Sequence, residues 1–286
     1  MKKILFLFVL AFSITCFAQS ESSLLWEISG NELDKPSYLF GTIHIIPKKD
    51  YFFTDAMEDK FKRCELLVTE IDMASLSFAD KLKLSMKIFL EDGQTLESLM
   101  GREKYHSFKG YLVDSIGIKE SKIDKRYNKV KPFFVMTFIL KDYLGKVKFY
   151  EQELAKYSKK EGMTTGGLET VDYQFSLIEK IPMDDQVEYF LDLSSLHEFD
   201  SLLSIYKTQD ISKLYTFSLE TEDYGEYDSI FMNDFLYTRN ENWIPQIESI
   251  IKKQPAFIAV GALHLPGENG IIELLRRKGY TIKPVK

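Results

Sequence analysis

The chain has 286 residues, a formal net charge of −6 at pH 7, and 45% hydrophobic residues. The mildly acidic balance and the lack of any lysine- or arginine-rich block argue against nucleic acid as a partner. The length and apolar content are sufficient for one large folded unit with its own core.

The first 18 residues have the pattern of a secretory signal peptide. Two lysines precede an apolar segment, residues 4–14, that is too short to span a bilayer, and Cys16-Phe17-Ala18 fits a cleavage site. Lipoprotein processing at Cys16 is the alternative, although the residues before it form a poor lipobox. We therefore expect one mature domain, residues 19–286, that is exported to a bacterial periplasm and has no membrane span.

The first elements after this segment predict a parallel sheet. Residues 24–28 have the pattern of a short strand, and residues 38–46 form an apolar run typical of a buried strand. Helical spacing follows over residues 54–63, with Thr54 as the N-cap. Another apolar strand covers residues 65–71. This strand–helix–strand order is typical of parallel strands.

The middle of the chain is predicted to be helical. The helical segments cover residues 78–90, 95–99, 102–116, 131–144 and 149–160. We interpret residues from about 75 to 160 as a large helical insertion in the domain.

The last part of the chain returns to the sheet. A short strand over residues 162–169 ends in a glycine-rich turn, and residues 256–265 form a second buried strand. The other predicted elements are helices at 170–180, 182–208, 211–219, 231–251 (interrupted by Pro245) and 271–278, and a strand at 280–285. The sequence thus predicts an α/β fold with a mostly parallel central sheet built from both chain ends.

Two similar segments near opposite ends of the chain each carry a histidine. Gly41-Thr42-Ile43-His44 and Gly261-Ala262-Leu263-His264 both follow an apolar run. Neighbouring strands would place the two imidazoles at one site, where they could hold a metal or transfer protons. Gly41 and Gly261 would let a ligand approach the backbone closely, or would simply form bulges. A lone histidine after a strand more often has a structural role, so the pairing is what indicates a site.

Two carboxylates complete the candidate site. Glu70 ends the strand at 65–71 and Glu169 follows the glycine-rich turn; ligands of α/β sheets bind beyond such strand ends. His44 and His264 would be metal ligands, with Glu70 and Glu169 as further ligand or general base. The ordinary alternatives are a solvated acid for Glu70 and a helix N-terminal acid for Glu169.

These segments together resemble the TraB/PrgY/GumN family over nearly all of the mature chain. The matching segments are the two Gly-x-x-His motifs, Glu70, residues 150–154, residues 167–170, Arg239-Asn240 and residues 260–280. The resemblance implies a fold similar to that of erythromycin esterase and the ChaN-like haem-binding proteins. It also implies activity on peptides. The animal Tiki relatives are membrane-associated metalloproteases that trim secreted signalling proteins and depend on manganese or cobalt, and the bacterial members TraB and PrgY are linked to shutting down peptide pheromones.

The resemblance also gives roles to Arg239 and Asn240, which spacing alone would place on an exposed helix face. They would orient the substrate or stabilise an oxyanion. We predict an exported metal-dependent hydrolase, a peptidase that acts on secreted peptides or proteins with Mn, Co or Zn as cofactor. The alternative is a non-catalytic periplasmic protein that sequesters a peptide or haem-like ligand. The C-terminal anchor of Tiki is absent, so no surface tethering is expected.

Overall fold

The computed structural model describes residues 22–91, 93–193, 195–221 and 231–286, so the predicted signal peptide lies outside the described residues. A six-stranded sheet in the order β6-β4-β7-β2-β1-β8 forms its centre. The strands are β1 (Leu25–Ser29), β2 (Ser37–Thr42), β4 (Leu66–Thr69), β6 (Thr164–Gly167), β7 (Ala256–Gly261) and β8 (Thr281–Val285). Parallel pairing joins β6, β4, β7 and β2, whereas β1 runs antiparallel to β2 and β8. The predicted α/β fold with a mostly parallel sheet from both chain ends is confirmed.

The C-terminal strand β7 lies between two N-terminal strands. β2 and β4 are parallel, as their strand–helix–strand order predicted, but both pair with β7 and not with each other. In the register, Tyr38 of β2 and Leu67 of β4 both face Phe257. The residues that follow β7 therefore emerge between the ends of β2 and β4.

The apolar runs form strands because both of their faces are covered. Every residue of β2 is buried, as are the first five residues of β7. On one side, helix α1 (Asp55–Lys62) begins at Thr54, whose side chain accepts a hydrogen bond from the Met57 amide as the N-cap prediction required. Phe61 of α1 packs on Phe257 with ring centroids 5.0 Å apart.

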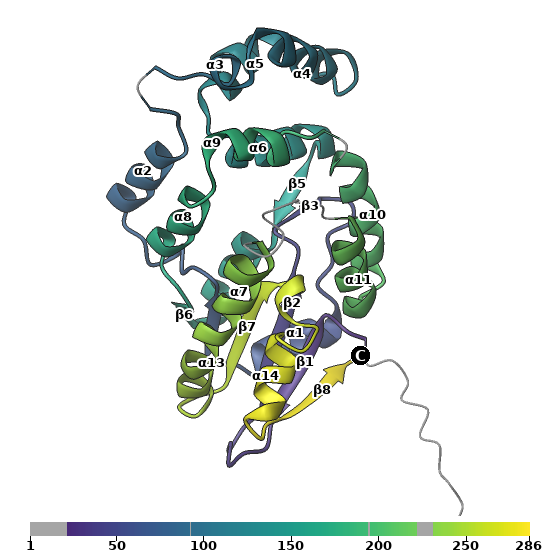
Figure 1. The fold of residues 1–286 in the computed structure, drawn as a ribbon. Helices are drawn as coiled ribbons and strands as arrows, with labels where there is room; N and C mark the ends of the chain where they lie inside the picture. Colours follow the sequence, from purple (N-terminus) through teal and green to yellow (C-terminus); the bar gives the residue numbers. More distant parts are fainter. Residues whose placement is uncertain (1–21, 92, 194, 222–230) are drawn as a thin grey trace, which may run out of the picture.

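Helices cover the sheet and extend beyond one end of it (Figure 1). In Figure 1, α13 and α14 lie in front of the sheet, and α3, α4, α5, α6 and α9 form the upper part. Besides α1, the helices of the described residues are α2 (Phe78–Lys87), α3 (Leu96–Met100), α4 (Arg102–Asp114), α5 (Glu120–Lys125), η1 (Tyr127–Lys129), α6 (Pro132–Leu144), α7 (Tyr150–Glu161), α8 (Val171–Glu179), α9 (Met183–Phe190), α10 (Ser195–Lys207), α11 (Ile211–Thr221), the π-helix η3 (Phe231–Tyr237), α13 (Thr238–Ile251), η4 (Ala262–His264) and α14 (Ile271–Arg277).

The upper helices have an apolar core of their own. Its buried residues include Leu96, Leu112, Ile123 and Ile139, and also Leu196 from beyond the predicted insertion. The insertion at about 75–160 therefore does not contain the whole of this core, and the proposed domain boundaries stay predictions. No helix of the described ranges is long and apolar enough to cross a membrane.

Several predicted bounds differ from the structure. The helix predicted at 182–208 is divided into α9 and α10, and both buried strands end early. The run at 38–46 is not one strand, because β2 ends at Thr42 and β3 (Ile45–Pro47) turns away to pair with β5 (Val147–Phe149) in a separate two-stranded sheet. The run at 256–265 ends as a strand at Gly261 and continues as the 3-10 turn η4.

The predicted interruption at Pro245 is also wrong, because α13 continues through this residue. A proline inside a helix costs about 3 kcal/mol. The burial of Trp243, Ile244 and Ile247 on α13 offsets this cost, since tertiary packing supplies most of a helix's stability.

Candidate functional site

Four parallel strands end at the same edge of the sheet. Thr42 of β2 is in register with Gly261 of β7, and Thr69 of β4 is in register with Gly167 of β6. The predicted site residues follow these strand ends: His44 after β2, Glu70 after β4, Glu169 after β6 and His264 after β7. The structure thus brings together all four residues that the sequence indicated, by the geometry that parallel pairing imposes.

A buried arginine joins the two carboxylates. Arg239 of α13 donates from Nη2 to Glu70 and, at 2.6 Å, to Glu169; its Nε lies 3.1 Å from both carboxylate oxygens of Glu169. Its Nη1 donates to the Phe235 carbonyl at 2.8 Å. The Trp243 ring packs under the guanidinium at 4.7 Å and donates from Nε1 to Glu169 at 3.0 Å. Arg239 and Asn240 are buried, so the prediction from spacing alone that they form an exposed helical pair is wrong.

This arrangement keeps Glu70 ionised. Burial by itself raises the pKa of Glu70, but the Arg239 guanidinium beside it, together with the two histidines, holds this pKa well below its usual range. The carboxylate is also positioned by neutral donors. Its Oε1 accepts the Gly261 amide at 2.8 Å and its Oε2 accepts the Gln174 side-chain amide at 3.1 Å. Glu70 is therefore a fixed, charged acceptor at the strand ends.

His264 is buried and neutral. Its Nδ1 lies 2.7 Å from Asn240 Oδ1, and its Nε2 lies 3.2 Å from Nη1 of Arg239. Burial lowers the pKa of His264 to about 3. The Glu70 carboxylate opposes this shift, and the positive charge of Arg239 adds to it. The ring also packs on Trp243 with centroids 4.6 Å apart.

His44 has the opposite electrostatic environment. It lies in the break between β2 and β3, its side chain is 66% exposed, and its Nδ1 lies 2.8 Å from Glu151 Oε1. Thr42 donates its hydroxyl to the same oxygen at 3.1 Å. The Glu151 carboxylate raises the pKa of His44 to about 9, and Glu70 adds to the increase. His44 is therefore a cation at neutral pH, whereas His264 is not.

Glu151 at the start of α7 was not predicted as a site residue. It is 107 residues from His44 in the chain, and the pairing of β3 with β5, which places Phe149 opposite Ile45, brings the two side chains together. The signal that could have identified it is its place in the segment 150–154, which contributed to the family resemblance.

Glu70, His44 and His264 surround one point next to Gly261. A methyl group placed on Gly261 would lie 3.4 Å from Glu70 Oε1, 3.4 Å from His264 Cδ2 and 3.9 Å from His44 Nε2. The Nε2 atom of His264 is 3.9 Å from the same carboxylate oxygen. The absence of a side chain at Gly261 thus leaves the space that all three groups face.

Gly41 has a different reason to be glycine. A Cβ atom there would lie 3.0 Å from the Ala262 Cα, so the residue allows β2 to pack closely on η4. Its carbonyl accepts the Tyr206 hydroxyl at 3.0 Å. Substrate binding at Gly41 and Gly261 stays a prediction, and Gly261 is the glycine that borders the reactive groups.

A cavity of about 410 Å³ adjoins the arginine cluster. Glu169, Tyr173, Asn242 and Trp243 are among the residues that line it. It extends the site on the side of β6 and α8, where a longer substrate could lie.

The donor atoms do not form a metal site in this arrangement. The described residues contain no group of three or more His, Cys, Asp or Glu side chains that could hold a metal ion. Asn240 and Arg239 contact the two ring nitrogens of His264, and Arg239 binds Glu70. The donors directed at the shared point are His44 Nε2 and Glu70 Oε1, fewer than the three protein ligands of a typical catalytic zinc.

The profile of the TraB/PrgY/gumN family matches residues 24–284. The chain belongs to this family. It is 23% identical to metalloprotease TIKI1 of Danio rerio over 92% of its own length and 63% of that protein. It is 24% identical to human metalloprotease TIKI1 (93% and 62%) and 22% identical to the metalloprotease TIKI homolog of Nematostella vectensis (93% and 67%).

Family membership confirms the resemblance that the sequence motifs indicated. The chain nevertheless spans less than two thirds of the length of both TIKI1 proteins. No solved structure matches it. The predicted likeness to erythromycin esterase and ChaN-like proteins therefore stays a prediction.

Proposed function

We propose that this chain hydrolyses peptide bonds in peptides or proteins at the space bordered by Glu70, His44 and His264. The observation that carries the proposal is that these three groups face one point beside Gly261 while their environments drive their pKa values in different directions. Such separation is typical of groups that divide acid and base roles. The metalloprotease names of the TIKI relatives support a peptide substrate.

Each step of amide hydrolysis has a suitable group. The attacking water needs an acceptor for its proton, and Glu70 Oε1 is an ionised acceptor at the shared point. The carbonyl oxygen and the leaving amine need a proton donor. His44 is protonated below pH of about 9 and presents Nε2–H to the same point, because Nδ1 is held by Glu151.

The buried groups position this pair. Arg239 has bonds to Glu70, Glu169 and the Phe235 carbonyl, so its nitrogens serve the protein and not a substrate. We assign to Arg239 and Asn240 the positioning of Glu70 and His264, in place of the direct substrate contact that the sequence suggested.

Dependence on Mn, Co or Zn stays a prediction from the resemblance and from the names of the relatives. A metal bound when the protein is loaded would polarise the scissile carbonyl or the attacking water. The donor set observed here does not fit one, because Arg239 bonds both His264 and Glu70. Export to a periplasm also stays a prediction.

The test is cleavage of a mixed peptide pool, followed by mass spectrometry, with the purified protein and four single histidine variants. His44→Ala should reduce the rate at least about 100-fold, the usual share of acid–base catalysis. His264→Ala removes a wall of the shared space beside Gly261 and should also reduce the rate. His106→Ala and His197→Ala replace exposed histidines and serve as controls, with no change expected. Equal rates in all five proteins would refute the proposal, and peptide bound but recovered intact would favour the sequestering alternative.

A chelation arm separates the metal question from the hydrolase question. The geometry predicts that a chelator leaves cleavage unchanged. If the chelator abolishes cleavage and added Mn, Co or Zn restores it, Arg239 must move away from His264 and Glu70, and the histidines bind the ion as the sequence suggested.

A further inference from the structure

Helix α2 exposes an apolar face that no other part of the described structure covers. The helix has no buried residue along its ten positions. Phe78 is 82% exposed, Leu82 53% and Met86 67%, and Phe89, two residues beyond the helix, is 41% exposed. The four-residue spacing of Phe78, Leu82 and Met86 places them on one side of the helix, which we call the α2 face.

The opposite side and the end of α2 hold it to the protein. Leu84 and Ile88 are half-buried. Backbone hydrogen bonds join Leu90 to the Lys129 carbonyl and Lys131 to the Ile88 carbonyl. The α2 face is therefore held in an outward orientation by a fixed attachment.

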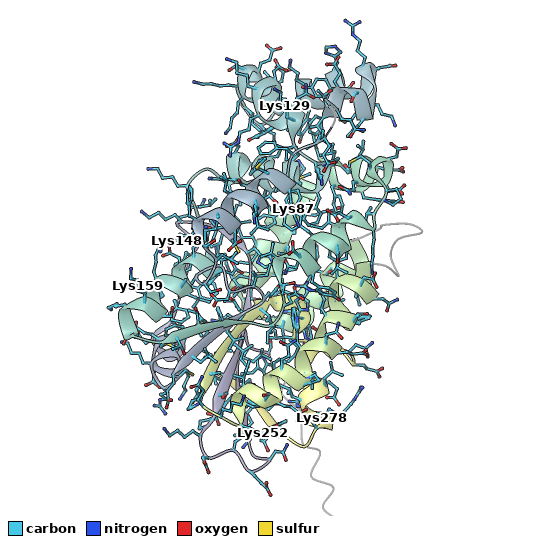
Figure 2. The ribbon with its side chains drawn as sticks, turned by 90° about the vertical axis from the view of Figure 1, so that its left-hand side faces the viewer. Lys87, Lys129, Lys148, Lys159, Lys252 and Lys278 are labelled. Atoms are coloured by element: carbon cyan, nitrogen blue, oxygen red, sulfur yellow. The ribbon has the colours of Figure 1, made fainter. Side chains whose placement is uncertain are left out.

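Lys87 adds a side-chain attachment. It pairs with Asp172 of α8 at 2.5 Å and lies over the Phe175 ring at 5.4 Å. Figure 2 shows Lys87 in the middle of the side of the molecule that faces the viewer.

Two lysines flank the α2 face. At 100° per residue, Lys81 lies on one side of the apolar stripe and Lys83 on the other, and both are exposed. Within the described residues neither lysine has an ion-pair partner. Asp80 of the same helix interacts with Lys83, so the two lysines exceed the nearby carboxylate by one and leave a local positive charge beside the apolar stripe, in a protein whose net charge is −6.

We propose that the α2 face docks onto the surface of an anionic phospholipid bilayer. An apolar stripe of phenylalanine, leucine and methionine, with lysines on both flanks, suits the boundary between acyl chains and headgroups. The apolar side chains enter the acyl region, while Lys81 and Lys83 reach the phosphates at either side. Each such lysine adds binding energy at an anionic surface.

A bilayer fits this surface better than a peptide does. A peptide ligand needs a groove, but the cavities beside Glu169, beside Trp26 and beside Gln186 are lined by other elements. A convex helix with charges on both flanks matches a deformable, extended, anionic surface. This docking is independent of the proposed hydrolysis.

The test places a fluorescent reporter on the α2 face. Phe78→Trp should show a blue-shifted emission and at least about a twofold loss of intensity when the full chain meets vesicles of phosphatidylcholine and phosphatidylglycerol (3:1) with brominated acyl chains. Trp26 and Trp243 are buried and give a constant background. Leu219→Trp, at a 52% exposed position on α11, is the matched control and should not be quenched.

Charge reversal gives the second arm. Lys81→Glu with Lys83→Glu in the Phe78→Trp protein should weaken partitioning at least about tenfold. No quenching in Phe78→Trp, or equal quenching in Leu219→Trp, would overturn the proposal. Dimers in light scattering that disappear on Phe78→Ser, without any vesicle effect, would show instead that a second copy covers the face.

Discussion

The side chain of Asn240 determines which ring nitrogen of His264 carries the hydrogen. Its Nδ2 donates to the carbonyls of Asn269, at 2.8 Å, and His264, at 3.3 Å, so its Oδ1 is the atom that faces the ring at 2.7 Å. An amide oxygen accepts, and His264 Nδ1 must therefore carry the hydrogen. The lone pair of the ring is then on Nε2, where it accepts from Arg239.

Replacing Asn240 by aspartate should make His264 easier to protonate. A carboxylate next to Nδ1–H stabilises the imidazolium, so we expect Asn240→Asp to raise the pKa of His264 from about 3. NMR titration of the ring protons measures this change. Asn242→Asp, at an exposed position two residues along α13, is the control. An unchanged titration in Asn240→Asp would contradict the assigned contact.

Removal of Arg239 should destabilise the fold. Arg239→Met leaves Glu70 and Glu169 buried without their cation, and breaking a buried ion pair costs roughly 3–5 kcal/mol. Urea unfolding gives the free energy. Adding Glu70→Gln to Arg239→Met removes one uncompensated charge, so the double variant should regain part of the lost free energy of unfolding. If the single variant unfolds like the parent protein, the cluster does not stabilise the fold as described.

The sequence predicted the strands of the site better than it predicted their ends. The apolar runs of β2 and β7 indicated buried parallel strands, and parallel pairing was enough to place Glu70 and Glu169 at one edge. The position of His44 was less predictable. Residues 38–46 are nearly all apolar, so the run looks continuous in the sequence. The pairing of β3 with β5, a segment about 100 residues away, is what divides it.

The partners of the site residues were not readable from local patterns. Arg239 is charged and lies on a helix, so spacing indicates exposure. The carboxylates of Glu70 and Glu169, which follow β4 and β6, compensate the burial of its charge. Glu151 is in the first turn of α7, where acidic residues are common for reasons of the helix dipole. Its contact with His44 is a property of the tertiary fold.

The two histidines should give the protein a stability optimum near pH 6.5. The pKa of His264 is lowered to about 3, so the unfolded chain binds more protons between pH 3 and 6.5, and stability falls as pH falls through this range. The pKa of His44 is raised to about 9, so the folded chain binds more protons between pH 6.5 and 9, and stability falls as pH rises there. The alkaline effect is the smaller one, because water screens the exposed His44.

Urea midpoints at pH 5, 6.5 and 8.5 check this optimum. His264→Gln should flatten the acidic side and His44→Gln the alkaline side. If both variants keep the pH dependence of the parent protein's urea midpoint, other groups cause that dependence.

Glu151→Gln should shift the alkaline limb of the pH–rate profile for cleavage to lower pH. His44 acts as the protonated donor, so the rate of the parent protein falls as pH rises through about 9. Without the Glu151 carboxylate the pKa of His44 is lower, and the fall should begin at lower pH. Glu153→Gln, which alters a carboxylate bound to Lys148 and Lys156, is the control. Coincident profiles in all three proteins would exclude His44 as the donor.

The most direct test of the proposed site is the cleavage rate of Gly261→Ala. Gly261 has φ −52° and ψ 136°, which alanine adopts freely, and the new methyl group makes only ordinary contacts with Glu70, His264 and His44. Gly166→Ala, whose methyl would meet Leu66 at 3.8 Å, is the matched control. The proposal predicts that both variants fold like the parent protein and that Gly261→Ala alone loses cleavage, by at least about 100-fold. Full activity in a folded Gly261→Ala protein would contradict it, because the space that the three groups share would then not be where the substrate reacts.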